Sequence, residues 1–130
     1  MPFRLVKVPK EQAELSKVGL EIVMAANDLG KPVDPDGFLR SWMTGTKVLA
    51  EYDAQNKIIG LAFMVSGRRW FEDFDTATLL YATGENKAGM MEFAQSVASA
   101  AGAYSMIYDT GEERHLPDGT IQHIIHEVVL

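Results

Sequence analysis

The sequence contains no cysteine among its 130 residues. A disulfide framework and a thiolate metal site are therefore excluded, and the lack of disulfide chemistry fits the cytoplasmic location that we expect. Long apolar runs are missing as well, since no segment approaches the ~20 residues that a membrane-spanning helix needs. The first ten residues, MPFRLVKVPK, lack the apolar region of a signal peptide. We expect no membrane partner.

Basic residues are fewer than acidic residues. The chain carries 12 Lys and Arg against 18 Asp and Glu, which gives a formal net charge of −6. Arg68 and Arg69 form the only adjacent basic pair. Because nucleic-acid-binding proteins usually present a basic surface to the phosphates, we expect no nucleic-acid partner.

Hydrophobic residues make up 47% of the sequence, and the length favours a single domain over residues 1–130. Apolar periodicity predicts helices over residues 10–29, from Pro35 to just before Gly45, and over 88–101. Apolar runs predict strands over residues 3–8, 48–52, 58–65, 76–83, 104–108 and 120–130. Residues 70–75 are expected to form an irregular strand or bulged edge. Residues 109–119 are expected to form a polar loop, with at most one helical turn near 112–115.

The resulting order is β-α-α-β-β-β-α-β-β. Short turns join the middle strands, which makes them antiparallel. The helix between the strands at 76–83 and 104–108 makes that pair a parallel crossover. We therefore expect an α/β (α+β) fold, with a mixed, mainly antiparallel sheet and helices on both faces.

A glycine-bearing loop, GENKAG at residues 84–89, connects a predicted strand to a predicted helix. Backbone N–H groups and the dipole at a helix N-terminus favour an anion such as a pyrophosphate. The candidate residues of this site are Gly84, Glu85, Asn86, Lys87 and Gly89. The alternative is an ordinary loop in which Asn86 caps the helix.

This order, with an anion-binding turn after the fourth strand, resembles the GNAT superfamily of acyl-CoA-dependent N-acyltransferases over residues 3–109. The family loop reads Arg/Gln-x-x-Gly-x-Gly/Ala. In this chain Gly89 matches its first glycine, Asn86 stands at the Arg/Gln position, and Met91 stands where a small residue is usual.

The resemblance implies that acetyl-CoA is the cofactor. Backbone amides from Lys87 to Met90 would hold its pyrophosphate, with Lys87 as counter-charge. The strand residues Tyr81, Ala82 and Thr83 would lie along the acyl chain. The acceptor would be a small amine or a protein lysine.

Amine acylation needs a base, because only a neutral amine has a free lone pair. Glu51, Glu72 and Asp73 lie on or beside the predicted central strands and are the candidate carboxylates. Tyr108, at the end of the fifth strand, is the candidate proton donor. We expect no metal site at His123 and His126, because strand residues three apart point to opposite faces.

A non-catalytic role is the alternative function. The family's fourth helix is missing and its last pair of strands is reduced to one, as in small phage-encoded proteins of this fold. The chain would then be a structural or interaction protein, such as a virion component. Its contact surfaces would be residues 70–75, from Trp70 to Asp75, and the last strand, which could also pair with a second copy.

Overall fold

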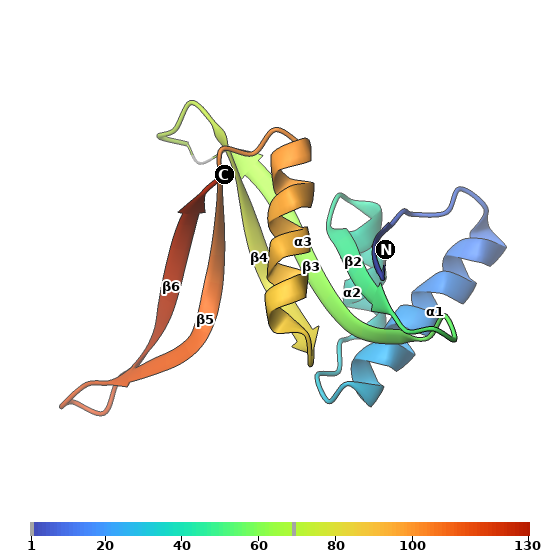
Figure 1. Ribbon diagram of the computed structural model, residues 1–130, viewed down its shortest axis with the longest axis horizontal. Helices are drawn as coiled ribbons and strands as arrows, with labels where there is room; N and C mark the ends of the chain where they lie inside the picture. The colour runs from blue at the N-terminus through green and yellow to red at the C-terminus, as the bar shows by residue number, and fades with distance from the viewer. Residues whose placement is uncertain (1, 69) are drawn as a thin grey trace.

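The computed structural model describes residues 2–68 and 70–130. Its strands form one six-stranded sheet in the order β1-β2-β3-β4-β5-β6 (Figure 1). The strands are β1 (Phe3–Val6), β2 (Lys47–Tyr52), β3 (Ile58–Arg68), β4 (Asp75–Gly84), β5 (Ser105–His115) and β6 (Ile121–Val129). The helices are α1 (Gln12–Asp28), α2 (Pro35–Met43) and α3 (Lys87–Ala100).

Neighbouring strands are antiparallel except for β4 and β5, which are parallel and joined through α3. This arrangement confirms the mixed, mainly antiparallel sheet predicted from the sequence.

The helices cover both faces of the sheet. On one face α1 and α2 pack over side chains that include Val48 and Phe63. On the other face α3 packs over side chains that include Leu49 and Met64. Because neighbouring residues of a strand point to opposite faces, β2 and β3 supply both cores. Their nearly continuous apolar sequence is explained by this two-sided burial.

The helix boundaries follow from local chemistry. The Asp34 carboxylate accepts a hydrogen bond of 2.8 Å from the Gly37 amide and caps α2, with Pro35 in the first helical position. The sequence places Met43 on the apolar face of α2 with Phe38 and Trp42, but in the structure Phe38 and Trp42 are buried and Met43 is exposed. Within the described residues, no helix is long and apolar enough to cross a membrane.

The region between β3 and β4 differs from the prediction. The polar segment from Ser66 to Arg69 predicts a turn from the sequence, but Ser66 to Arg68 extend β3 and pair with β4 up to the register Arg68↔Asp75. The turn therefore falls after Arg68, and residues 70–74 form no strand. The predicted turn position Arg69 lies outside the described residues. Cross-strand pairing with Thr76 and Ala77 overrides the weak turn preference of a Ser-Gly pair.

The segment after Tyr108 also differs. The polar loop expected at residues 109–119 is instead the outer half of a long hairpin, because β5 continues to His115 and pairs with β6. The helical turn expected near residues 112–115 is absent from this part of the described chain. Glu113 to His115 pair with residues 121–123, which supplies the hydrogen bonds that the sequence alone did not suggest.

Candidate functional site in the fork of the sheet

The sheet forks between β4 and β5. These two strands pair over only four residues each, from Thr76↔Ser105 to Leu79↔Tyr108. Beyond that point β4 continues toward α3, whereas β5 turns away together with β6, as Figure 1 shows. In the described chain, the edge of β4 from Leu80 to Gly84 therefore has no strand partner on its β5 side.

A bulge on each strand accompanies the fork. In β4, Leu79 pairs with Met64 and Tyr81 pairs with Phe63, so Leu80 is an extra residue. In β5, the register with β6 shifts between Asp109 and Glu113. Since bulges bend a strand and increase its twist, they turn the two strands apart at neighbouring positions.

The fork holds a cavity of about 420 Å³, within the range of small-molecule sites. Its wall is built from β4, β5, β6, α3 and the loop between α1 and α2. The lining residues are Lys31, Leu79, Leu80, Tyr81, Ala82, Thr83, Lys87, Met90, Met91, Tyr108, Asp109, Thr110, Gly111 and His123.

The N-terminus of α3 supplies the basic end of one wall. The Asn86 side chain accepts a hydrogen bond of 3.0 Å from the Gly89 amide, and the Met90 amide donates to the Asn86 carbonyl. Among the described residues, the amides of Lys87 and Ala88 have no acceptor. Two of the four amides expected to face a pyrophosphate are therefore free, and Asn86 is the helix cap that the sequence offered as the alternative.

The two glycines of the loop have structural reasons to be glycine. Gly84 has φ +117°, and a Cβ there would lie 2.8 Å from the Cα of Gly60. A Cβ on Gly89 would lie 2.6 Å from Asn86 Nδ2 and 2.8 Å from Phe3 Cζ. Gly84 closes β4, and only Glu85 and Asn86 separate it from α3, so the loop is shorter than predicted.

The opposite wall carries Tyr81 and Lys31. The Tyr81 hydroxyl donates to the Lys31 carbonyl at 2.6 Å, and the Lys31 ammonium lies 4.7 Å from the centre of the Tyr81 ring. The Tyr81 ring also stacks on Phe63 with centroids 4.4 Å apart. Burial raises the pKa of Tyr81, so its hydroxyl stays protonated and remains a donor at neutral pH.

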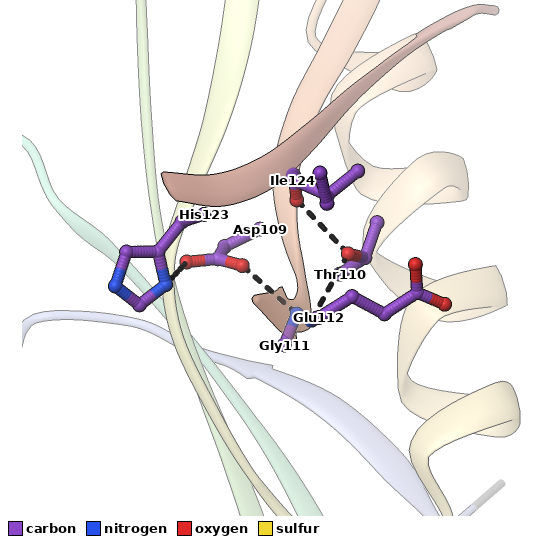
Figure 2. A network of polar contacts seen from close by, with 6 residues as sticks. All are labelled: Asp109, Thr110, Gly111, Glu112, His123 and Ile124. Carbon is purple, nitrogen blue, oxygen red and sulfur yellow. Dashed lines mark hydrogen bonds and ion pairs between the residues drawn. The ribbon is translucent and has the colours of Figure 1, made fainter. Parts of the chain in front are cut away.

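The β5 bulge fixes an acidic and a basic side chain at the cavity (Figure 2). Asp109 Oδ1 accepts from the Gly111 amide at 2.8 Å, while Asp109 Oδ2 lies 3.4 Å from His123 Nδ1. Thr110 Oγ1 donates to the Ile124 carbonyl at 2.9 Å and accepts from the Glu112 amide. These contacts hold the bulge against β6.

Neither a protein-family model nor a curated protein sequence matches the chain. Solved structures do. A GNAT family acetyltransferase from Staphylococcus aureus is 14% identical, with a TM-score of 0.61 over 85% of this chain and 86% of that one. A ribosomal-protein-alanine N-acetyltransferase from Brucella melitensis is 7% identical, with a TM-score of 0.62 over 92% and 86%. An aminoglycoside acetyltransferase from an uncultured soil sample is 13% identical, with a TM-score of 0.56 over 89% and 81%.

The fold is GNAT-like. At these identities the likeness establishes the architecture alone, and it covers 85% and 92% of this chain in the first two structures. Function must therefore be argued from the residues that the GNAT-like fork brings together.

The structure brings most of the predicted cofactor-binding residues to the cavity. Its wall includes Tyr81, Ala82, Thr83, Lys87 and Met90. The remaining four do not line the cavity. Gly84, Asn86 and Gly89 shape the turn and the helix start, and Glu85 lies in the short loop between β4 and α3.

The structure does not bring the predicted catalytic residues together in the cavity. Tyr108 lines the cavity. Glu51 does not, because it is 8% exposed on β2 with its carboxylate against Gly60. Glu72 accepts a hydrogen bond from Thr76 at the far end of β4. Asp73 is likewise outside the cavity wall.

Sequence reasoning missed Lys31, Asp109 and His123 as cavity residues. Lys31 lies in the loop between α1 and α2, and nothing in its surroundings signals contact with β4. The sequence analysis considers His123 only together with His126, as a possible metal-binding pair. The described residues hold no group of three or more His, Cys, Asp or Glu that could bind a metal.

Proposed function

We propose that the protein is an acyl-CoA-dependent N-acyltransferase that transfers an acetyl group from acetyl-CoA to an amine. The observation that supports this proposal is the cavity in the fork between β4 and β5, at the N-terminus of α3. It combines an unpaired strand edge with positive charge, which are the two features that a thioester-bearing pantetheine arm and a pyrophosphate require.

The residues present fit acetyl-CoA. The free edge of β4 from Leu80 to Gly84 can pair with the amides of an extended pantetheine arm, as a peptide adds to a sheet edge. The amides of Lys87 and Ala88 and the Lys87 ammonium suit the pyrophosphate. When bound, acetyl-CoA supplies an acyl group activated as a thioester.

Tyr108 is the proposed proton donor to the departing sulfur. It is the last residue of β5 paired with β4, and it lines the cavity. Its ring packs edge-on against His126 with centroids 5.8 Å apart, which restricts its orientation. A phenol donates its proton readily to a developing thiolate and needs no prior ionisation.

The acceptor is proposed to be a small amine or a protein lysine. The fold neighbours include enzymes whose names specify an aminoglycoside and a ribosomal-protein alanine. We therefore include both kinds of amine among the compounds to test, together with a lysine-containing peptide and a short diamine.

Two measurements test the proposal. Isothermal titration with acetyl-CoA should show saturable binding, and no heat at millimolar ligand would overturn the proposal. Transfer to each amine can be followed by release of the CoA thiol with a thiol-reactive dye. Because the chain has no cysteine, the protein itself adds no background to that signal. Mass spectrometry of the amine should show the added acetyl group.

A second candidate function is that of a structural or interaction protein, such as a virion component. The observation that favours it is the tip between β3 and β4, where Trp70 is 94% exposed and Phe71 is 63% exposed. The edge strand β6 also exposes Ile121, Ile125 and Val129. Exposed apolar side chains of this kind are typical of contact surfaces, including those between two copies of a chain.

Sedimentation velocity separates the two candidates when it is combined with the titration. An interaction protein that self-associates should form a dimer that Trp70→Ser and Phe71→Ser, or Ile125→Lys on β6, dissociate. The same protein should give no acetyl-CoA heat. A monomer that binds acetyl-CoA would contradict this second candidate.

A further inference from the structure

The cavity wall contains few groups that can accept a proton at neutral pH. Its titratable residues are Lys31, Tyr81, Lys87, Tyr108, Asp109 and His123. Lysine ammonium groups and tyrosine hydroxyls already carry their protons. Only the Asp109 carboxylate and the His123 imidazole remain, whereas the three carboxylates predicted from the sequence, Glu51, Glu72 and Asp73, lie outside the cavity wall.

Both oxygens of Asp109 are engaged. Oδ1 accepts from the Gly111 amide at 2.8 Å, and Oδ2 faces His123 Nδ1 at 3.4 Å (Figure 2). The second distance is slightly longer than an N–H···O hydrogen bond, and such contacts tighten in a substrate complex. A carboxylate beside Nδ1 favours the tautomer that carries its proton there. Nε2 of His123 is then the free basic atom, with no partner in the part of the chain that the structure describes.

The pair lies on the face of the fork opposite α3. Met106 and Tyr108 pack with the core beneath α3, so alternation directs Asp109 to the other face. The contact with Asp109 places His123 there as well. Figure 2 shows the imidazole and α3 on opposite sides of the hairpin. Consecutive residues of β5 thus present a phenol to the face that bears the basic N-terminus of α3 and a carboxylate–imidazole pair to the other face.

We propose that His123, oriented by Asp109, is the catalytic base that removes a proton from the attacking amine. This inference rests on the proposed acyltransferase function. Nε2 of His123 takes one proton from the ammonium and leaves a neutral amine. Acyl transfer then forms the C–N bond and breaks the C–S bond, with the electron pair leaving on sulfur. The sulfur is protonated by Tyr108, the amide nitrogen loses its second proton to restore that phenol, and the imidazolium releases its proton to water.

The exposure of the pair suits this role. The side chains of His123 and Asp109 are 56% and 48% exposed, so the ring can meet an incoming amine and exchange its proton with solvent. A contact between side chains this exposed adds little to stability. Substitutions at either position should therefore leave the fold intact and report on chemistry.

The kinetic test compares His123→Gln, Asp109→Asn and the control His115→Gln. His115 is an exposed histidine on the same hairpin, outside the cavity wall, 3.7 Å from Glu113. The probes are acetyl-CoA with a lysine-containing peptide and with a short diamine. We expect His123→Gln to lower kcat by about a hundredfold, Asp109→Asn to lower it less, and His115→Gln to leave it unchanged. Acetyl-CoA affinity should be the same in all four proteins.

A second readout does not depend on turnover. Long-range ¹H–¹⁵N correlation spectra report which ring nitrogen of a histidine carries the proton, and the chain has only three histidines to assign. In the protein saturated with acetyl-CoA, neutral His123 should be protonated at Nδ1 and bare at Nε2. Asp109→Asn should shift that tautomer ratio, whereas His115→Gln should not.

The outcomes distinguish this inference from the proposed function. Absence of acetyl-CoA binding to the unaltered protein would overturn the acyltransferase proposal itself. Binding with His123→Gln turning over within twofold of the unaltered protein would overturn only the assignment of His123 and would favour water as the proton acceptor. A proton found on Nε2 in the saturated protein would overturn the assignment even if no tested amine is acylated.

Discussion

Gly84 at the end of β4 lies directly opposite Gly60 of β3, so close that a Cβ on Gly84 would stand 2.8 Å from the Cα of Gly60. The same Cβ would lie 3.0 Å from the Ile59 carbonyl oxygen. Both neighbours are backbone atoms, which cannot turn aside as a flexible side chain can. Gly84 also has φ +117°, a region that other residues avoid. Two independent constraints therefore require glycine where β4 passes into α3.

Gly84→Ala should destabilise the protein for this reason. We expect the free energy of unfolding to fall by about 1–3 kcal/mol, the usual cost of a strained backbone conformation. Urea denaturation followed by tryptophan fluorescence measures the loss. Gly67→Ala is the matched control, because Gly67 belongs to the same pair of strands and has open space around its Cα. An equal loss in both variants would contradict the explanation by close backbone contact.

Asn86→Asp separates the capping role of this residue from anion binding. The aspartate keeps an oxygen that can accept the Gly89 hydrogen bond, and its negative charge favours a helix N-terminus. Stability should therefore be preserved or increased. The added charge beside Lys87 should weaken acetyl-CoA binding by about 1 kcal/mol, or roughly fivefold. Urea denaturation and isothermal titration of the same sample check both expectations.

Asn86→Ala is the complementary variant. It removes the cap and should cost ~1 kcal/mol of stability, without adding a charge that repels phosphate. If Asn86→Asp and Asn86→Ala bind acetyl-CoA equally well, the pyrophosphate does not lie at the N-terminus of α3.

Lys87→Met should weaken acetyl-CoA binding, because it removes the positive charge at the first position of α3 and keeps the aliphatic stem. The loss should shrink as salt rises from 0.05 to about 0.5 M, since screening reduces the contribution of an exposed charge. Lys57→Met is the control, because Lys57 lies in the turn between β2 and β3, outside the cavity wall. Titrations at both salt concentrations would contradict the phosphate role if the two variants behave alike.

Local signals predicted much of the fold. The start of α2 at Pro35 agrees between sequence and structure. The Asp34 cap and the proline at the first helical position both act within one turn, so their effect can be read from neighbouring residues. The continuous apolar run of β3 is typical of a strand covered on both faces, and residues of both cores lie on it. The parallel pairing of β4 and β5 was predicted from the helix between them, because two adjacent strands joined through a helix that crosses the sheet run in the same direction.

The rest depended on contacts between distant residues. The outer half of β5 looks like a polar loop because Gly111 and its acidic neighbours have low strand propensity, and only pairing with β6 holds it extended. The Asp109–His123 contact crosses that hairpin and depends on a bulge whose register no local pattern encodes. At Gly89 a local pattern pointed to more than the structure requires. The glycine suggested a phosphate-binding loop, but its lack of a side chain is explained by close packing against Phe3 and Asn86.

The protein should lose stability in alkaline solution. Burial raises the pKa of Tyr81 above its ordinary value of 10.0, and burial likewise raises that of Tyr52, although Arg4 partly opposes the second shift. A raised pKa in the folded state means that the protonated form is favoured on folding. The associated stability is fully present below pH 10 and is lost as the pH rises through the folded-state values.

Urea denaturation between pH 8 and 11 measures this slope. Tyr81→Phe should flatten it in part, and Tyr81→Phe combined with Tyr52→Phe should flatten it further. Tyr81→Phe also removes the hydrogen bond to the Lys31 carbonyl, so its stability at pH 8 should fall by about 1 kcal/mol. An unchanged alkaline slope in the double variant would show that other groups govern the transition.

Tyr108→Phe tests the proton donor without disturbing the fold. The variant keeps the ring that packs on His126, so the free energy of unfolding should change by no more than about 0.5 kcal/mol. Acetyl-CoA affinity should also stay constant, whereas kcat should fall by up to about a hundredfold because the leaving sulfur loses its proton source. Tyr104→Phe is the control, since Tyr104 packs on Phe74 outside the cavity wall.

A comparison of two acceptors tests the same assignment further. The loss of kcat in Tyr108→Phe should be the same for a peptide lysine and a short diamine, because Tyr108 serves the donor side of the fork. A loss that depends on the amine would instead place Tyr108 in acceptor recognition.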